Sequence, residues 1–269
     1  MSNHHADHIY LEVKSLRTLF IIGTAGSGKS LFTGAYAEWL KGQKQNVATL
    51  NLDPGAIDLP YTPDIDIREW INLYDLMEDY HLGPNGAMIL ASDLIANEAE
   101  SIREEVENLE PDILVVDTPG QMEVFAFRAS GPFIVKEIGE EEKAIVYLFD
   151  SVFSSNPLNY VSNLFLSAAV YNRFFTPQIN VLSKCDLIPR EKVDQIVDWS
   201  ASPLKLEDAI ERELHGDKRL LSRDLMRAIY RLGLRFLLIP VSAKTYEGMV
   251  NVNAAIERVL AAGDRYTIE

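Results

Sequence analysis

A glycine-rich stretch that ends in a lysine and a serine is the clearest candidate for chemistry in this chain of 269 residues. It follows an apolar run and precedes a helical pattern, the context in which such a loop binds phosphate. Its glycines let the backbone turn N–H groups toward phosphate oxygens, Lys29 can reach the β and γ phosphates, and Ser30 can bind Mg²⁺. The alternative is a glycine-rich turn without a ligand. The expected phosphate-binding residues are Gly23, Thr24, Ala25, Gly26, Ser27, Gly28, Lys29, Ser30 and Leu31.

A carboxylate stands at the end of the apolar run 113–116, shortly before a Gly-Gln pair. In enzymes that transfer phosphoryl groups, a strand-end carboxylate such as Asp117 holds the Mg²⁺ shell, and a glutamine such as Gln121 can orient the attacking water. Gly120 can direct its backbone N–H to the γ-phosphate, so that this loop orders with a triphosphate and relaxes after hydrolysis. The alternative role for Asp117 is to cap the turn that follows the strand.

Two short motifs farther along the chain could recognise a purine base. Ser183-Lys184-Cys185-Asp186 resembles the guanine-reading Asn-Lys-x-Asp signature of GTPases, with serine in place of asparagine. Asp186 can accept hydrogen bonds from two guanine N–H donors, where adenine presents an acceptor, and the stem of Lys184 can cover the base. Ser183 can form only part of the usual tether, which we expect to affect affinity more than base choice. The alternative is a solvated lysine and aspartate at a strand end.

A further motif, Ser242-Ala243-Lys244, looks like the short loop whose backbone supports the guanine oxygen. It also follows an apolar run. With it, four motifs stand along the chain in the order typical of GTPases.

Six apolar runs separated by helical stretches must position these residues. Because the runs are apolar throughout rather than alternating, they predict strands buried on both faces, as in a parallel sheet flanked by helices. The expected fold is therefore α/β, a doubly wound and mainly parallel sheet, with ligands at the carboxyl ends of the strands. The predicted strands are residues 18–23, 47–52, 113–117, 144–150, 179–183 and 236–241.

Composition and charge restrict the classes of function. Hydrophobic residues make up 47% of the chain, and 25 Lys+Arg against 40 Asp+Glu give a net charge of -15. The negative charge opposes bulk binding of nucleic acid but allows a small anionic ligand held by backbone N–H groups. The longest apolar run, residues 144–149, is too short to span a membrane, and the polar first ten residues do not resemble a signal peptide. We expect a cytoplasmic protein that does not bind membranes.

We expect one domain over residues 1–269, with an N-terminal arm at 1–16 and two long insertions. The first insertion, residues 54–110, contains Pro-rich turns followed by Gly-Pro-Asn-Gly. The second, residues 189–235, predicts two or three helices with breaks at Ser202-Pro203 and Gly216.

Inside the first insertion, Gly83-Pro84-Asn85 resembles the signature of the GPN-loop GTPases, supported by Leu59-Pro60-Tyr61 and residues 65–69. The resemblance extends from Phe20 to about Leu260. It implies a P-loop fold and a homodimer whose nucleotide sites face the subunit interface. It also implies that Asn85 reaches the partner's nucleotide, and that Asp53 lies beside Mg²⁺ and the attacking water. Taken alone, Gly-Pro-Asn-Gly predicts only a turn.

Several weaker candidates for functional residues can also be explained by ordinary structural roles. Arginines every four residues from 219 to 235 form a basic stripe that suits an acidic partner or pairs with nearby acids. Three N-terminal histidines could bind a metal but are better explained as a mobile tail, and acidic residues at 98–107 predict a solvated helix face. We expect Cys185 to be a small side chain that fills space at a strand end rather than a reactive thiol. These candidates are Arg219, Arg223, Arg227, Arg231 and Arg235; His4, His5 and His8; and Glu98, Glu100, Glu104, Glu105 and Glu107.

Together these motifs predict a GTPase that binds GTP or GDP with Mg²⁺, and the resemblance to the GPN-loop GTPases implies that it is a homodimer. The catalytic candidates are Lys29, Asp53, Asn85 and Gln121, and the Mg²⁺ candidates are Ser30, Asp53 and Asp117. The nucleotide would further contact Gly120, Ser183, Lys184, Asp186, Ser242, Ala243 and Lys244. One alternative is a P-loop kinase that phosphorylates a nucleoside or polynucleotide end, with the arginine stripe as a lid. Another is an assembly factor for a larger complex, such as an RNA polymerase, whose nucleotide cycle switches a protein-binding surface.

Overall fold

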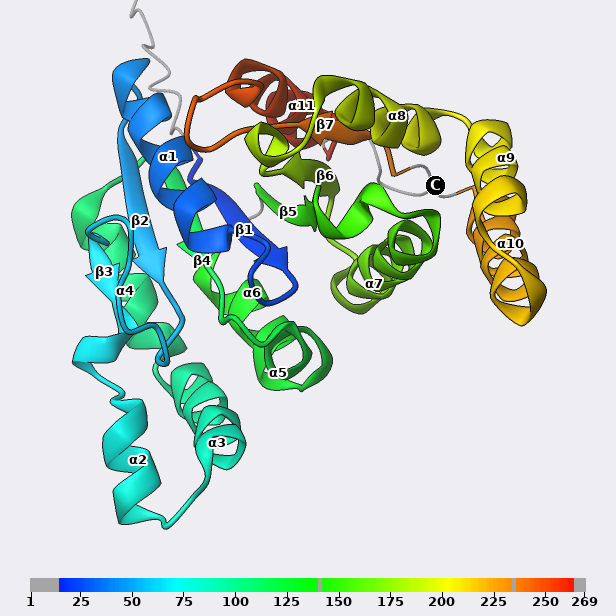
Figure 1. Cartoon of the computed structure of the whole chain (residues 1–269). Helices are drawn as coiled ribbons and strands as arrows, with labels where there is room; N and C mark the ends of the chain where they lie inside the picture. Colours follow the sequence, from blue (N-terminus) through cyan, green and yellow to red (C-terminus); the bar gives the residue numbers. More distant parts are fainter. Residues whose placement is uncertain (1–14, 140–141, 234–235, 264–269) are drawn as a thin grey trace, which may run out of the picture.

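The computed structural model describes residues 15–139, 142–233 and 236–263. Its centre is a seven-stranded sheet with the order β3-β2-β4-β1-β5-β6-β7, and every pair of neighbouring strands is parallel (Figure 1). The strands are β1 (Arg17–Gly23), β2 (Val47–Asn51), β3 (Ile65–Asp66), β4 (Ile113–Asp117), β5 (Lys143–Asp150), β6 (Gln178–Ser183) and β7 (Leu238–Pro240). The α/β class and the parallel sheet predicted from the apolar runs are confirmed.

The longer strands are apolar on both faces because helices cover both faces of the sheet (Figure 1). One face packs against α1 and α11 through Phe32, Tyr36 and Val252, and the other against the remaining long helices. The helices are α1 (Lys29–Gly42), α2 (Leu73–Asp79), α3 (Pro84–Asn97), α4 (Ala99–Leu109), α5 (Met122–Phe127), α6 (Ser130–Ile138), α7 (Pro157–Phe174), α8 (Arg190–Ala201), α9 (Pro203–Glu213), α10 (Gly216–Arg231) and α11 (Met249–Gly263). Short 3₁₀ turns are η1 (Ile67–Glu69), η2 (Phe153–Ser155) and η3 (Cys185–Leu187).

The first insertion differs from its expected form in two ways. It contributes the edge strand β3, which was not predicted because two residues give too short a pattern. The prediction of a turn at Gly-Pro-Asn-Gly was wrong, because Gly83 is the N-cap of α3 and Pro84 begins the helix. Proline suits the first helical position, where its missing N–H costs no hydrogen bond. Asn85 therefore lies in the first turn of a helix.

The second insertion forms the three helices α8, α9 and α10, and the breaks fall at Ser202-Pro203 and Gly216 as predicted. Helices α9 and α10 lie at one end of the molecule, and α2 and α3 at another (Figure 1). Within the described ranges, no helix combines the length and apolar character needed to cross a membrane.

Most of the acidic residues predicted to form a solvated face on α4 are exposed, and only Glu98 is partly buried. His4, His5, His8 and Arg235 lie outside the described residues.

Candidate functional site

The glycine-rich loop connects β1 to α1 at the carboxyl edge of the sheet. Gly26 and Gly28 have φ angles of 75° and 93°, a region that favours glycine, so they supply the turn that the loop requires. Lys29 is buried, and its ammonium group donates to the Gly23 and Thr24 carbonyl oxygens at 3.0 and 3.1 Å. Burial lowers the pKa of Lys29, while the nearby carboxylates of Asp117 and Asp53 act in the opposite direction. The loop and its lysine thus form one compact cradle.

Asp117 lies at the end of β4 with none of its surface exposed. Burial raises its pKa to about 6, although the Ser30 hydroxyl, the Lys29 charge and the Tyr61 hydroxyl lower it. The Tyr61 hydroxyl donates to Asp117 Oδ2 at 3.3 Å. The other oxygen, Oδ1, is buried and has no hydrogen-bond partner within the described part of the chain. A buried carboxylate oxygen without a partner is costly unless a ligand satisfies it.

This arrangement fits a magnesium ion. Mg²⁺ retains several waters and is held by one or two carboxylates together with substrate phosphates, rather than by a cage of protein ligands. The unpaired oxygen of Asp117 and the neighbouring Ser30 hydroxyl are oxygen donors that could contribute to such a site. The described ranges contain no cluster of three or more His, Cys, Asp or Glu side chains able to hold a metal.

The Asp53 carboxylate connects two loops at the edge of the sheet. Its Oδ1 accepts from the Gly55 N–H and its Oδ2 from the Gly120 N–H, both at 2.9 Å. Gly120 was expected to direct this N–H to a γ-phosphate, but here it donates the group to Asp53. The same contact places Asp53 beside the loop that carries Gln121.

Asn85 and Gln121 come together within one chain. Gln121 is the N-cap residue of α5, and its Nε2 lies 3.4 Å from Oδ1 of Asn85 in the first turn of α3. Resemblance to the GPN-loop GTPases implied instead that Asn85 reaches a partner's nucleotide. The contact to Gln121 connects Asn85 to the predicted water-orienting residue of its own chain.

A hollow of about 170 Å³ lies where the phosphate loop meets the two base-reading motifs. Asp186 lies on η3 with its side chain exposed, and Lys184 enters this turn with φ of 58°. Ser242 is buried beside the hollow rather than lining it, and its Oγ accepts from the Thr245 N–H of its own loop. The lining residues are Ser27, Gly28, Leu31, Phe32, Ser183, Lys184, Asp186, Leu187, Val241, Ala243 and Lys244.

Ser183 and Lys184 join the base-reading motif to the phosphate loop. The Ser183 hydroxyl lies 2.8 Å from the Ser27 carbonyl oxygen and 3.1 Å from that of Phe149. The Lys184 ammonium contacts the Gly26 carbonyl oxygen and pairs with Asp150 at 2.7 Å. Serine therefore retains a tether to the phosphate loop, although it is shorter than the asparagine of the usual signature.

Sequence reasoning missed Tyr61 and Asp150 as site residues. Asp150 ends a predicted strand, but the lysine that it pairs with lies 34 positions away. In the sequence analysis, Tyr61 served only as part of the Leu-Pro-Tyr motif that supports the family resemblance. A signal for it was present in Gly34, because a glycine in the middle of α1 indicates that another segment packs closely there. Cys185 is half-buried, and burial raises its pKa to about 11, which agrees with a filler and not with a reactive thiol.

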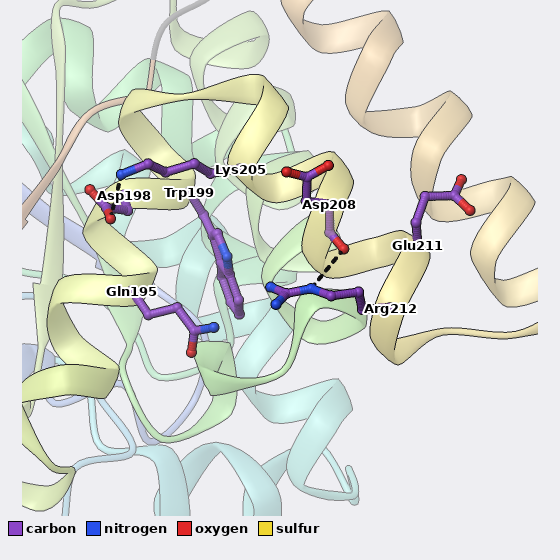
Figure 2. A pocket seen from close by; sticks show the side chains of 7 residues that line it. All are labelled: Gln195, Asp198, Trp199, Lys205, Asp208, Glu211 and Arg212. Atoms are coloured by element: carbon purple, nitrogen blue, oxygen red, sulfur yellow. Dashed lines mark hydrogen bonds and ion pairs between the residues drawn. The ribbon is translucent and has the colours of Figure 1, made fainter.

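A second hollow of about 430 Å³ lies between α8 and α9, away from the strand ends (Figure 2). Its charged side chains pair locally, as Lys205 does with Asp198 at 2.6 Å. On the facing helix α10, Arg219 and Arg223 pair with Glu211, and Arg227 pairs with Glu207. These pairs support the interpretation that nearby acids neutralise the stripe at Arg219, Arg223 and Arg227.

Comparison with known proteins agrees with this geometry. Residues 21–262 match a family model described as a conserved hypothetical ATP binding protein. GPN-loop GTPase 1 of Saccharomyces cerevisiae is 28% identical over 264 residues, covering 94% of this chain and 68% of the yeast protein. A GPN-loop GTPase of Pyrococcus abyssi is 29% identical over 252 residues, covering 90% of this chain and 97% of the archaeal one.

The crystal structure of a GTPase in apo form from Pyrococcus abyssi superposes with a TM-score of 0.80 at 26% sequence identity. The superposition covers 90% of this chain and 97% of the archaeal chain. The likeness therefore extends over most of the chain.

Proposed function

Because the chain belongs to the GPN-loop GTPase family, we propose that it binds GTP with Mg²⁺ and hydrolyses it to GDP and phosphate at the carboxyl edge of its sheet. One observation carries this proposal. The phosphate loop, the Asp186 turn and the Ala243-Lys244 loop line one hollow, although they lie far apart in the sequence. A phosphate cradle and a purine-reading carboxylate are thus at the two ends of a single site.

The identity of the base rests on Asp186. The matching family model is described as ATP-binding, whereas the named relatives are GTPases. An exposed carboxylate at the rim of the hollow accepts hydrogen bonds from the N1 and N2 donors of guanine, whereas adenine offers an acceptor at that edge. We therefore assign guanine.

The residues near the phosphates have separate tasks in hydrolysis. Lys29 and the loop N–H groups stabilise the negative charge on the phosphates as the terminal group departs. Asp53 and Gln121 orient the attacking water, a role supported by the contact of Asp53 with the loop that carries Gln121 and by that of Asn85 with the Gln121 amide. Ser30 and Asp117 would hold Mg²⁺, which when bound neutralises charge on the β- and γ-phosphate oxygens.

The contact between Asp53 and Gly120 suits a switch. For the Gly120 N–H to reach a γ-phosphate, it must leave the Asp53 carboxylate, so triphosphate binding exchanges one charge-assisted hydrogen bond for another. This exchange frees Asp53 to orient water only when a γ-phosphate is bound.

We extend the proposal to a homodimer that forms through the face around Asn85, and to a role in assembling a larger protein complex in the cytoplasm. The exposed first turn of α3 supports the dimer, and the family resemblance supports the assembly role. Light scattering in GDP and in a non-hydrolysable GTP analogue tests the dimer. Affinity capture with the two nucleotide forms tests the client, since a switch retains a partner in only one of them.

The decisive test of the enzymatic activity is phosphate release from GTP with no acceptor added. A GTPase releases phosphate under these conditions, whereas a kinase releases almost none without its acceptor. The kinase alternative lacks support in the structure, because Arg219, Arg223 and Arg227 of the suggested lid pair with acidic residues on α9. Isothermal titration with GDP and ADP then separates guanine from adenine recognition, and binding of ADP alone would contradict the proposal.

A further inference from the structure

Tyr61 connects the first insertion to the carboxylate at the end of β4. Its hydroxyl donates to Asp117 Oδ2 at 3.3 Å, across 56 positions of sequence. Burial and the neighbouring Asp117 carboxylate raise the pKa of Tyr61 above its ordinary value. The phenol therefore stays protonated and acts as a donor throughout the physiological range of pH.

The ring of Tyr61 lies directly on helix α1 at Gly34. A Cβ atom at Gly34 would lie 2.7 Å from Tyr61 Cβ and 3.1 Å from Cγ, closer than side chains approach one another. Glycine inside a helix is less favourable than alanine by about 1 kcal/mol. The close approach of Tyr61 explains why a glycine occupies this position in the helix.

The loop that carries Tyr61 is anchored on both sides. Asp64 accepts from the backbone N–H and the hydroxyl of Thr49 on β2, each at 2.8 Å. On the other side, Arg68 donates to the Ala56 carbonyl oxygen at 2.9 Å and pairs with Asp66 on β3. These contacts define where the tyrosine hydroxyl lies relative to Asp117.

We propose that Tyr61 is a positioning residue for the magnesium site, which holds Oδ2 of Asp117 and leaves Oδ1 for the hydration shell of the cation. The inference rests on the proposed function. Its structural basis is the difference between the two oxygens: Oδ2 accepts from Tyr61, whereas Oδ1 is buried and makes no hydrogen bond within the described ranges, with the Ser30 hydroxyl and the Lys29 charge also acting on this carboxylate. Without the tyrosine hydroxyl, Oδ2 has lost its donor and the carboxylate can rotate, so the site holds the cation less well.

The test measures Mg²⁺ dependence of nucleotide binding rather than activity. GDP is titrated calorimetrically into the full chain at a series of Mg²⁺ concentrations. The quantity compared between variants is the Mg²⁺ midpoint, the Mg²⁺ concentration that gives half of the Mg²⁺-dependent gain in GDP affinity. For Tyr61→Phe we expect this Mg²⁺ concentration to rise about tenfold, because the variant loses one hydrogen bond to a charged group. GDP affinity in EDTA should stay within about twofold of the wild type, because Tyr61 does not line the base hollow.

Tyr36→Phe is the matched control. This tyrosine lies on α1 itself and is fully buried, and its hydroxyl contacts Oδ1 of Asn253 on α11 at 2.9 Å rather than Asp117. We expect its Mg²⁺ dependence to equal that of the wild type. A second variant, Gly34→Ala, displaces the Tyr61 ring without removing the hydroxyl, and it should raise the Mg²⁺ requirement in the same direction.

The outcomes separate the two proposals. A Tyr61→Phe protein whose Mg²⁺ midpoint stays within about threefold of the wild type overturns the inference alone, as does an equal rise in Tyr36→Phe. A wild-type protein that shows no Mg²⁺-dependent gain in guanine-nucleotide affinity overturns the proposed function and the inference together.

Discussion

The hydroxyl of Ser183 lies 2.8 Å from the carbonyl oxygen of Ser27, joining the end of β6 to the phosphate loop across 156 positions of sequence. Both residues are buried, so the bond is shielded from competing water. It makes the base-reading turn and the phosphate cradle parts of one rigid unit. Recognition of the purine and of the phosphates should therefore depend on each other.

Replacing Ser183 by alanine tests this coupling. The change leaves the Ser27 and Phe149 carbonyl oxygens without the serine hydroxyl, and GDP affinity should fall about fivefold to tenfold. Calorimetric titration measures the loss. Ser167→Ala is the control, because it removes a buried hydroxyl on α7 that bonds to Asn180 instead. If both variants lose affinity equally, the effect is one of general stability and not of the tether.

Changing Asp186 to asparagine should move base preference from guanine toward xanthine. The substitution replaces an acceptor by a donor, so it suits the C2 carbonyl of xanthine and opposes the C2 amine of guanine. Discrimination should change by about tenfold or more for each mismatched hydrogen bond to the charged group. Competition between GDP and xanthosine diphosphate measures it, with Asp208→Asn in the second hollow as an exposed control (Figure 2). Retained preference for GDP would count against Asp186 as the base reader.

Asn85→Ala should slow hydrolysis while leaving the fold intact. The side chain is exposed, but its contact with Gln121 keeps the predicted water-orienting amide in place. Loss of such a positioning contact lowers turnover by about tenfold to a hundredfold. Phosphate release under saturating GTP measures turnover, and Asn97→Ala at the other end of α3 is the control. Unchanged turnover in a protein of unaltered oligomeric state refutes the role given to Asn85.

The raised pKa of Asp117 predicts how stability varies with pH. Burial is the main reason why the pKa of this carboxyl is raised to about 6 in the folded chain, from an ordinary value of 3.8. A raised carboxyl pKa means that the folded state favours the protonated form, so this contribution to stability is present below pH 4 and is lost as pH rises through 6. Asp117→Asn should therefore stabilise the nucleotide-free protein at pH 7.5 by about 1 to 3 kcal/mol.

Denaturant unfolding without nucleotide or Mg²⁺ measures this difference at pH 7.5 and at pH 4.5. The gain from Asp117→Asn should shrink at the lower pH, where the wild-type carboxyl is largely protonated. A gain that is equal at both values contradicts burial of the charged form as its cause. At pH 7.5 the same variant should lose the Mg²⁺-dependent part of its GDP affinity.

Much of the fold could be predicted because its signals are local. Six strands follow from runs of apolar residues, and the helices of the second insertion follow from Ser202-Pro203 and Gly216. The edge strand β3 could not be found, since Ile65–Asp66 is too short to show a period. The helical start at Pro84 competed with an equally good turn, and packing of α3 on its neighbours decides between them.

The phosphate loop and the base-reading motifs could be assigned from sequence because each is a contiguous pattern with a known chemical logic. The contacts between motifs could not. The bond from Gly120 to Asp53 and the contact of Gln121 with Asn85 join residues 67 and 36 positions apart, and nothing in either local pattern names its partner. The roles of these residues in binding and catalysis remain predictions for the experiments above.

The close approach of Gly34 and Tyr61 limits how these two positions can vary during evolution. A larger residue at position 34 leaves no room for the tyrosine ring, so the helix can accept it only after the ring has been replaced or displaced. Such a replacement also removes the hydroxyl from Asp117. The two positions should therefore covary among related sequences, and chains that have lost the glycine should have rebuilt the support of the carboxylate in another way.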